Sequence, residues 1–225
     1  MKEFLAKMLA RARKHIGTET VNVFTVRSLY LSSLTELIDL VGFEMAIKKI
    51  FAWGFSMGHE YMLTLVKDIE KLKPFEETEI IAKIAWYMFA GRFPTGTDSR
   101  WEVWDGYRVF IARFWDDECP WCKGVRLPVK KTICAYPAGA YEGAYQTSQV
   151  ILYTAKKLDT ERFAIVREVK CRAAGDDTCE FWIVDFPRER EEVLMKLFAK
   201  AKEKYPELFK VIEPEYSLEI RKKIL

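Results

Sequence analysis

The chain has very few amide side chains. It contains one asparagine, Asn22, and two glutamines, Gln146 and Gln149, beside 36 basic and 33 acidic residues. This combination of few amides and many charges is typical of proteins from hot environments.

Long apolar runs and clusters of one charge sign are also missing. Charged side chains interrupt every hydrophobic segment before it reaches the roughly 18–20 residues that a membrane-spanning helix needs. The first residues carry charges throughout and do not resemble a secretory signal. Basic and acidic residues are interspersed, which is not the pattern of a nucleic-acid-binding surface. We therefore expect a cytoplasmic protein with no membrane span and no nucleic-acid partner.

Apolar and aromatic residues are abundant. They make up 50% and 14% of the chain, which indicates a large core, an apolar cavity or an apolar interface. The 225 residues contain no linker or repeat, so we expect a single domain. It divides into a helical part over 1–92, a hairpin-helix-hairpin part over 99–186, and a C-terminal helix and tail over 187–225.

The hydrophobic period predicts the order of elements. Helices come first, followed by a hairpin with an Asp-Gly turn, a helix rich in small residues that allows close packing, a second strand pair, and an amphipathic helix with Pro187 in its first turn. The expected helices cover 1–17, 25–41, 43–70, 74–91, 133–158 and 187–205, and the strand pairs cover 100–115 and 162–186.

The stretch REVKCRAAGDDTCEFWIV over 167–184 is a candidate metal site. A Gly-Asp-Asp turn between two strands can bring Glu168, Cys171 and Cys179 to one point, and zinc accepts such ligands in a tetrahedron of four. Cys134, at the start of the small-residue helix, is the candidate fourth ligand. Alternatively, Cys171 and Cys179 form a disulfide, Cys134 is a buried apolar residue and Glu168 is exposed.

A second cysteine pair, Cys119 and Cys122, lies in DECPWCKG. A redox site of the Cys-Pro-x-Cys kind needs its first cysteine at a helix N-terminus, and the residues after Cys122 are a poor helix opening. The remaining alternatives are a local disulfide, free thiols, or a rival zinc set in which Cys119 and Cys122 join Cys171 and Cys179.

Two of these segments also resemble a known family. ICAYPAGAYEGAY, followed by ILY, and then REVKCRAAGDDTCEFWIV are similar to the 4-vinyl reductase domain family, which includes archaeal hydrocarbon-binding proteins and is related to phenol and xylene sensory domains and to small TRAPP subunits. The resemblance implies that Cys134, Glu168, Cys171 and Cys179 bind a structural zinc. It also departs from the phenol sensors, because neither His15 nor His59 lies in a matching motif.

The resemblance implies an α+β fold, in which helices pack on a twisted antiparallel four-stranded sheet as in TRAPP subunits, with an N-terminal helical region. It also implies a homodimer formed through the N-terminal helices. The apolar stretch over 43–66 suits such an interface, or it is simply buried in its own core.

The expected function is to bind a small hydrophobic or aromatic molecule, in the manner of a sensor. Zinc with four protein ligands has no open position for substrate and acts as a structural ion. The alternatives are an assembly scaffold without a ligand, or a reductase acting on a vinyl group, for which no dinucleotide or phosphate loop is recognisable. Candidate cavity residues are the aromatic side chains of the first hairpin and the following helix: Trp101, Trp104, Phe110, Phe114, Trp115, Tyr136 and Tyr141.

Overall fold

The computed structural model describes most of the chain after the first 22 residues. The described residues are 23–73, 75, 82–83, 85–87, 90, 92–125 and 133–225. The helix expected over 1–17 lies outside the described residues, and so does most of the helix expected over 74–91.

A four-stranded antiparallel sheet forms the centre of the fold. Strands β1 (Gly96–Trp104) and β2 (Tyr107–Asp116) are joined at Asp105 and Gly106, whose φ angles of 50° and 85° suit the tight hairpin turn predicted from the Asp-Gly pair. Strands β3 (Arg162–Lys170) and β4 (Cys179–Pro187) form the second pair. The spatial order is β1-β2-β4-β3, so the predicted α+β fold class is confirmed.

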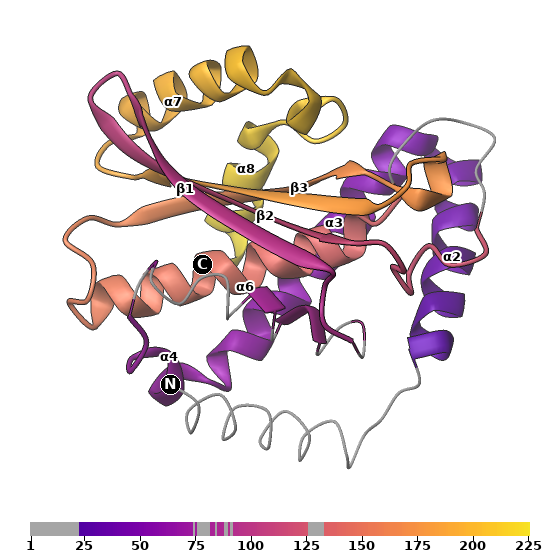
Figure 1. Ribbon diagram of the computed structural model, residues 1–225. Helices are drawn as coiled ribbons and strands as arrows, with labels where there is room; N and C mark the ends of the chain where they lie inside the picture. Colours follow the sequence, from indigo (N-terminus) through magenta and orange to yellow (C-terminus); the bar gives the residue numbers. More distant parts are fainter. Residues whose placement is uncertain are drawn as a thin grey trace.

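Helices cover both faces of this sheet (Figure 1). Helices α3 (Phe43–Leu63) and α6 (Ala135–Thr154) lie on one face, and α7 (Glu191–Lys204) lies on the other. Alternate strand residues serve the two sides, because successive side chains of a strand point to opposite faces. Phe181 and Ile183 pack towards α6, whereas Phe186 packs against α7.

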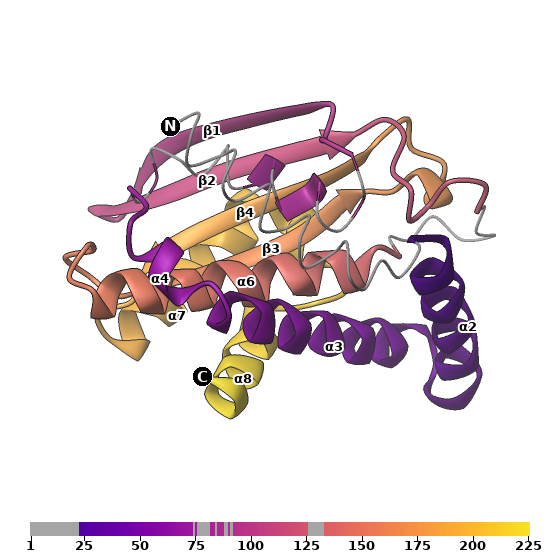
Figure 2. The same cartoon turned by 90° about the horizontal axis from the view of Figure 1, so that it is seen from below.

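Helices α3 and α6 approach each other closely because glycines line their contact (Figure 2). A Cβ atom added to Gly54 or Gly58 would lie 2.1 or 2.0 Å from a backbone carbonyl oxygen of α6. A Cβ on Gly139 or Gly143 would lie 2.0 Å from a carbonyl oxygen of α3. The close packing predicted from the small residues of α6 is therefore present, with glycines on both helices.

Three predicted elements differ in detail. The helix expected over 43–70 is divided into α3 and a short α4 (Val66–Ile69). Pro187 ends β4 and does not open α7, which begins four residues later. The predicted C-terminal tail contains the short helix η2 (Pro206–Phe209) and the helix α8 (Pro214–Ile224).

Helix α2 (Val23–Val41) agrees with the helix predicted over 25–41 and lies at one end of α3 (Figure 2). Within the part of the chain that the structure describes, none of the helices has the length and apolar character needed to cross a membrane.

Candidate metal centre and cavity

Four thiols and one carboxyl group meet where α6 begins. Cys134 directly precedes α6, Glu168 lies near the end of β3, and Cys171 and Cys179 flank the turn between β3 and β4. Cys122 comes from the turns that follow β2. The ligand atoms of all five residues lie within 4.8 Å of one another, and all five side chains are buried.

Strand alternation and a turn bring these groups together. Glu168 and Cys179 point to the face of the sheet that carries α6, in step with Val166 and Phe181. The turn closes when the Cys171 amide donates a hydrogen bond to Asp176 Oδ2 at 2.8 Å, and it passes through Gly175, whose φ of 100° favours glycine.

Hydrogen bonds tie the cluster to backbone amides. The Cys134 amide donates to Glu168 Oε2 at 2.7 Å, and the Arg172 amide donates to Cys179 Sγ at 3.4 Å. Glu168 Oε1 is buried and has no hydrogen-bond partner among the described residues. A buried carboxylate oxygen without a donor is costly, and a cation bound within the cluster would offset its charge.

The pKa values of the thiols and of Glu168 are shifted within the cluster. Burial raises the pKa of the Cys134 thiol well above its usual value. Burial and the neighbouring thiolates of Cys171 and Cys179 raise the pKa of Glu168. A hydrogen bond with Cys122 lowers the pKa of Cys171 to about 7. The raised pKa values of Cys134 and Glu168 favour their protonated forms in the absence of a cation, whereas a divalent cation would favour the charged forms. Soft thiolates with one carboxylate are ligands that zinc accepts.

The structure brings Cys134, Glu168, Cys171 and Cys179 together, and with them Cys122, which the sequence had placed in the rival set with Cys119, Cys171 and Cys179. All five cysteines, including Cys119, are buried free thiols, so neither the Cys171–Cys179 nor the Cys119–Cys122 disulfide is formed. Cys119 lies beside the cluster, but it is not one of the five residues whose ligand atoms all lie within 4.8 Å of one another.

The seven aromatic candidates do not share one cavity. Trp104 packs against Phe186 on the α7 side of the sheet, whereas Phe114 stacks on Tyr141 with ring centroids 4.7 Å apart on the α6 side. Trp101 is 37% exposed and contacts Phe110. Trp115 and Tyr136 are partly buried. These side chains mainly form core packing. Of the seven, only Tyr141 lines the apolar cavity beside the C-terminal half of α6.

This cavity lies beside the C-terminal half of α6 and has a volume of about 50 Å³. Its lining is mostly apolar: Met62, Leu72, Phe75, Ala82, Ala85, Tyr141, Ala144, Leu152 and Ile183, with Lys73, Tyr145, Ser148 and Gln149 as polar members. Gln149 is buried and donates from Nε2 to Asp185 Oδ2 at 2.9 Å, while its Oε1 has no partner among the described residues. In the sequence, Gln149 stood out only as one of three amide side chains, and nothing indicated that it lines a cavity.

A buried charge network continues from Gln149. Asp185 accepts from Arg162 Nε at 2.9 Å, and Arg162 also donates to the Asp185 carbonyl at 2.8 Å. Burial raises the pKa of Asp185 to about 6, against the attraction of Arg162. Arg221 pairs with Glu161 beside it. Positive and negative groups are matched here.

The fold and site thus define an α+β protein with a buried cluster of thiols and a carboxyl group that could hold a metal ion. No family model and no curated protein matches the chain. Among solved structures it is similar to a trafficking protein particle complex subunit 3 from Naegleria fowleri, covalently bound to palmitic acid, with 23% identity, a TM-score of 0.47, and coverage of 76% of this chain and 100% of that one.

It is also similar to the phenol-responsive sensory domain of the transcription activator PoxR with phenol. That similarity has 16% identity and a TM-score of 0.48, and covers 79% of this chain and 80% of that one. These two structures are of the kinds that the sequence resemblance named. At such low identity and TM-score they assign no site or ligand to this chain.

Proposed function

We propose that this protein is a zinc-stabilised module that binds a small apolar molecule carrying one hydrogen-bond donor. Two features support this function: the buried cluster of thiols and one carboxyl group at the start of α6, and the apolar cavity beside its C-terminal half. The first would hold the sheet and helices together, and the second would receive the ligand.

The zinc would bond to Cys134, Cys171 and Cys179, with Glu168 as the fourth ligand suggested by the sequence or Cys122 as the one added by the fold. When bound, such an ion supplies structural cross-links and charge neutralisation. Cys134 belongs to the start of α6, whereas Cys171 and Cys179 belong to the β3–β4 turn, so the bonds would join helix and sheet.

The observation that carries the ligand-binding proposal is the unpartnered Gln149 Oε1 in a mostly apolar cavity. Such cavities with a few placed polar groups are typical of small-molecule sites. A ligand with an O–H or N–H group would satisfy this oxygen, while its apolar body contacts side chains such as Leu72 and Ile183. The volume of about 50 Å³ accommodates only a few heavy atoms, so a ring-sized ligand requires lining side chains to move.

The test compares aniline with benzene, because aniline adds one N–H donor group to the same ring. We expect aniline to bind more tightly by calorimetry, by about 1 kcal/mol, the usual net contribution of a hydrogen bond. The cavity-filling variant Ala144→Leu should abolish binding of both probes. Tyr153→Ala, an exposed change on the same helix, is the matched control. Equal affinity of wild type and Ala144→Leu for both probes, or no binding at all, would contradict the proposal.

A homodimer is supported by a separate observation. Six large apolar side chains are exposed on the two N-terminal helices that the structure describes: Leu29, Leu40 and Val41 on α2, and Met45, Trp53 and Leu63 on α3. Light scattering of the purified protein at several concentrations would give its mass, and a monomer throughout would contradict this part. A scaffold without a ligand remains the alternative function if a dimer forms and neither probe binds.

A further inference from the structure

The cluster offers more ligands than a tetrahedral ion takes. Five atoms lie within 4.8 Å of one another, whereas a structural zinc ion takes four. One of the five must therefore stay outside the coordination shell, and the geometry indicates which one.

Cys122 contacts each of the other three thiols of the cluster. Its Sγ is 2.9 Å from that of Cys134, 3.5 Å from that of Cys171 and 3.5 Å from that of Cys179. Four sulfurs around one zinc ion, with Zn–S bonds of about 2.3 Å, are separated by about 3.8 Å. The two contacts of 3.5 Å are close to this value, whereas the contact of 2.9 Å between Cys122 and Cys134 is shorter, so these two thiols would have to move apart to make room for one ion.

Glu168 already has another contact in the same cluster. Its Oε2 accepts the hydrogen bond from the Cys134 amide, which holds the residue that precedes α6. A thiolate is also a softer ligand than a carboxylate oxygen and therefore suits zinc better as the fourth ligand.

We propose that Cys122 provides the fourth bond, so that the ion is held by the four thiolates of Cys122, Cys134, Cys171 and Cys179. Glu168 is then a positioning residue, which orients Cys134 through its amide. This inference rests on the proposed metal binding and differs from the ligand set that the sequence indicates.

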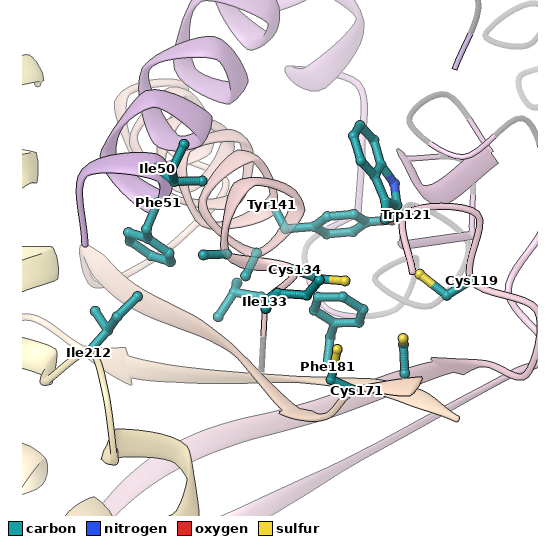
Figure 3. Close-up of a cluster of buried hydrophobic side chains, with 14 of the residues drawn as sticks. Ile50, Phe51, Cys119, Trp121, Ile133, Cys134, Tyr141, Cys171, Phe181 and Ile212 are labelled. Atoms are coloured by element: carbon teal, nitrogen blue, oxygen red, sulfur yellow. The ribbon is translucent and has the colours of Figure 1, made fainter. Parts of the chain in front are cut away.

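The consequence is that the ion also anchors the segment after β2. Trp121, next to Cys122, contacts Tyr30 of α2 edge-on with ring centroids 6.2 Å apart, and it contacts Tyr136 of α6 at 6.0 Å. Arg27 of α2 donates to the Lys123 carbonyl. Figure 3 shows Cys119 and Trp121 on this segment, on the same side of Cys134. A bond to Cys122 would thus link the metal to α2.

The decisive measurement is X-ray absorption at the zinc edge of the full-length wild-type protein, which needs no variant. We expect four sulfur neighbours and no nitrogen or oxygen neighbour. Three sulfurs and one oxygen would overturn the inference in favour of Glu168. No zinc bound to the chain would overturn both this inference and the metal part of the proposed function, whereas either occupied shell leaves the latter intact.

Cobalt binding to variants provides an independent test, because visible cobalt bands report the number of thiolate ligands. Cys122→Ser should change the spectrum and weaken cobalt binding by more than about tenfold. Glu168→Gln, which keeps an acceptor for the Cys134 amide, should leave the spectrum unchanged. Cys119→Ser is the matched control on the same segment and should also leave it unchanged. A changed spectrum in Cys119→Ser or Glu168→Gln, with none in Cys122→Ser, would overturn the inference.

Discussion

The two halves of α6 adjoin different buried polar groups. Near its start, four thiols and Glu168 meet with no ion pair from a described basic residue. Near its C-terminal half, Asp185 and Glu161 are paired with Arg162 and Arg221. A buried charge needs a partner. The second site provides its own cations, so only the first requires one from outside.

Metal removal should give the largest difference between the two sites. Stripping the ion with a chelator should lower the free energy of unfolding by on the order of 5–10 kcal/mol, because structural zinc contributes binding energy directly to folding. Denaturant unfolding with and without added zinc measures this change. Equal stability of the stripped and zinc-loaded protein would show that the cluster needs no external cation.

Removing Arg162, the cation paired with Asp185, should destabilise the protein without affecting metal binding at the thiol cluster. Arg162→Met leaves the buried Asp185 carboxylate without its ion pair, which should cost about 3–5 kcal/mol. The double variant Arg162→Met/Asp185→Asn should recover part of this loss, because the uncompensated charge is gone. Metal content should remain that of the wild type in both variants. Loss of the ion in Arg162→Met would show that the two sites are not independent.

The smallest expected effect is a pH dependence at Asp185. Its pKa is about 6 in the folded protein and 3.8 for an ordinary aspartate, so the folded state binds the proton more tightly. The stabilisation that comes from protonated Asp185 is fully present below pH 3.8 and is lost as the pH rises through about 6. This difference of about 2 pKa units corresponds to about 3 kcal/mol at most.

Asp185→Asn, which cannot titrate, provides the comparison. The stability difference between wild type and this variant should change between pH 4 and 6.5 and stay constant above that. Unfolding by denaturant at several pH values would measure it. A difference that is constant over the whole range would contradict the raised pKa.

Local sequence patterns predicted the elements that depend on neighbouring residues. The Asp-Gly pair predicts the β1–β2 turn because it adopts positive φ angles at low cost, and alternation predicts both strand pairs. Helix α8 was missed because the segment was treated as a tail, although its Leu218 packs in the core on the α7 side of the sheet.

The candidate site was predictable to the extent that its residues are close in sequence. Glu168, Cys171 and Cys179 are joined by one strand pair and its turn, so their spacing already indicated a common point. Cys134 was the candidate for the fourth ligand because another element had to provide one, and the family resemblance implied the same residue. The place of Cys122 beside it depends on how the chain after β2 returns across the start of α6, which is a matter of tertiary packing.

By itself, then, the sequence determined the strands, most helices and the candidate ligands around the β3–β4 turn, because local conformational preferences act over a few residues. Only the tertiary structure decided that Cys122 joins the cluster and that Gln149 lines the cavity with an oxygen left unpaired. Glycine contacts between α3 and α6 set how closely these two helices pack. Such long-range contacts depend on the packing of whole elements, which no short stretch of sequence specifies.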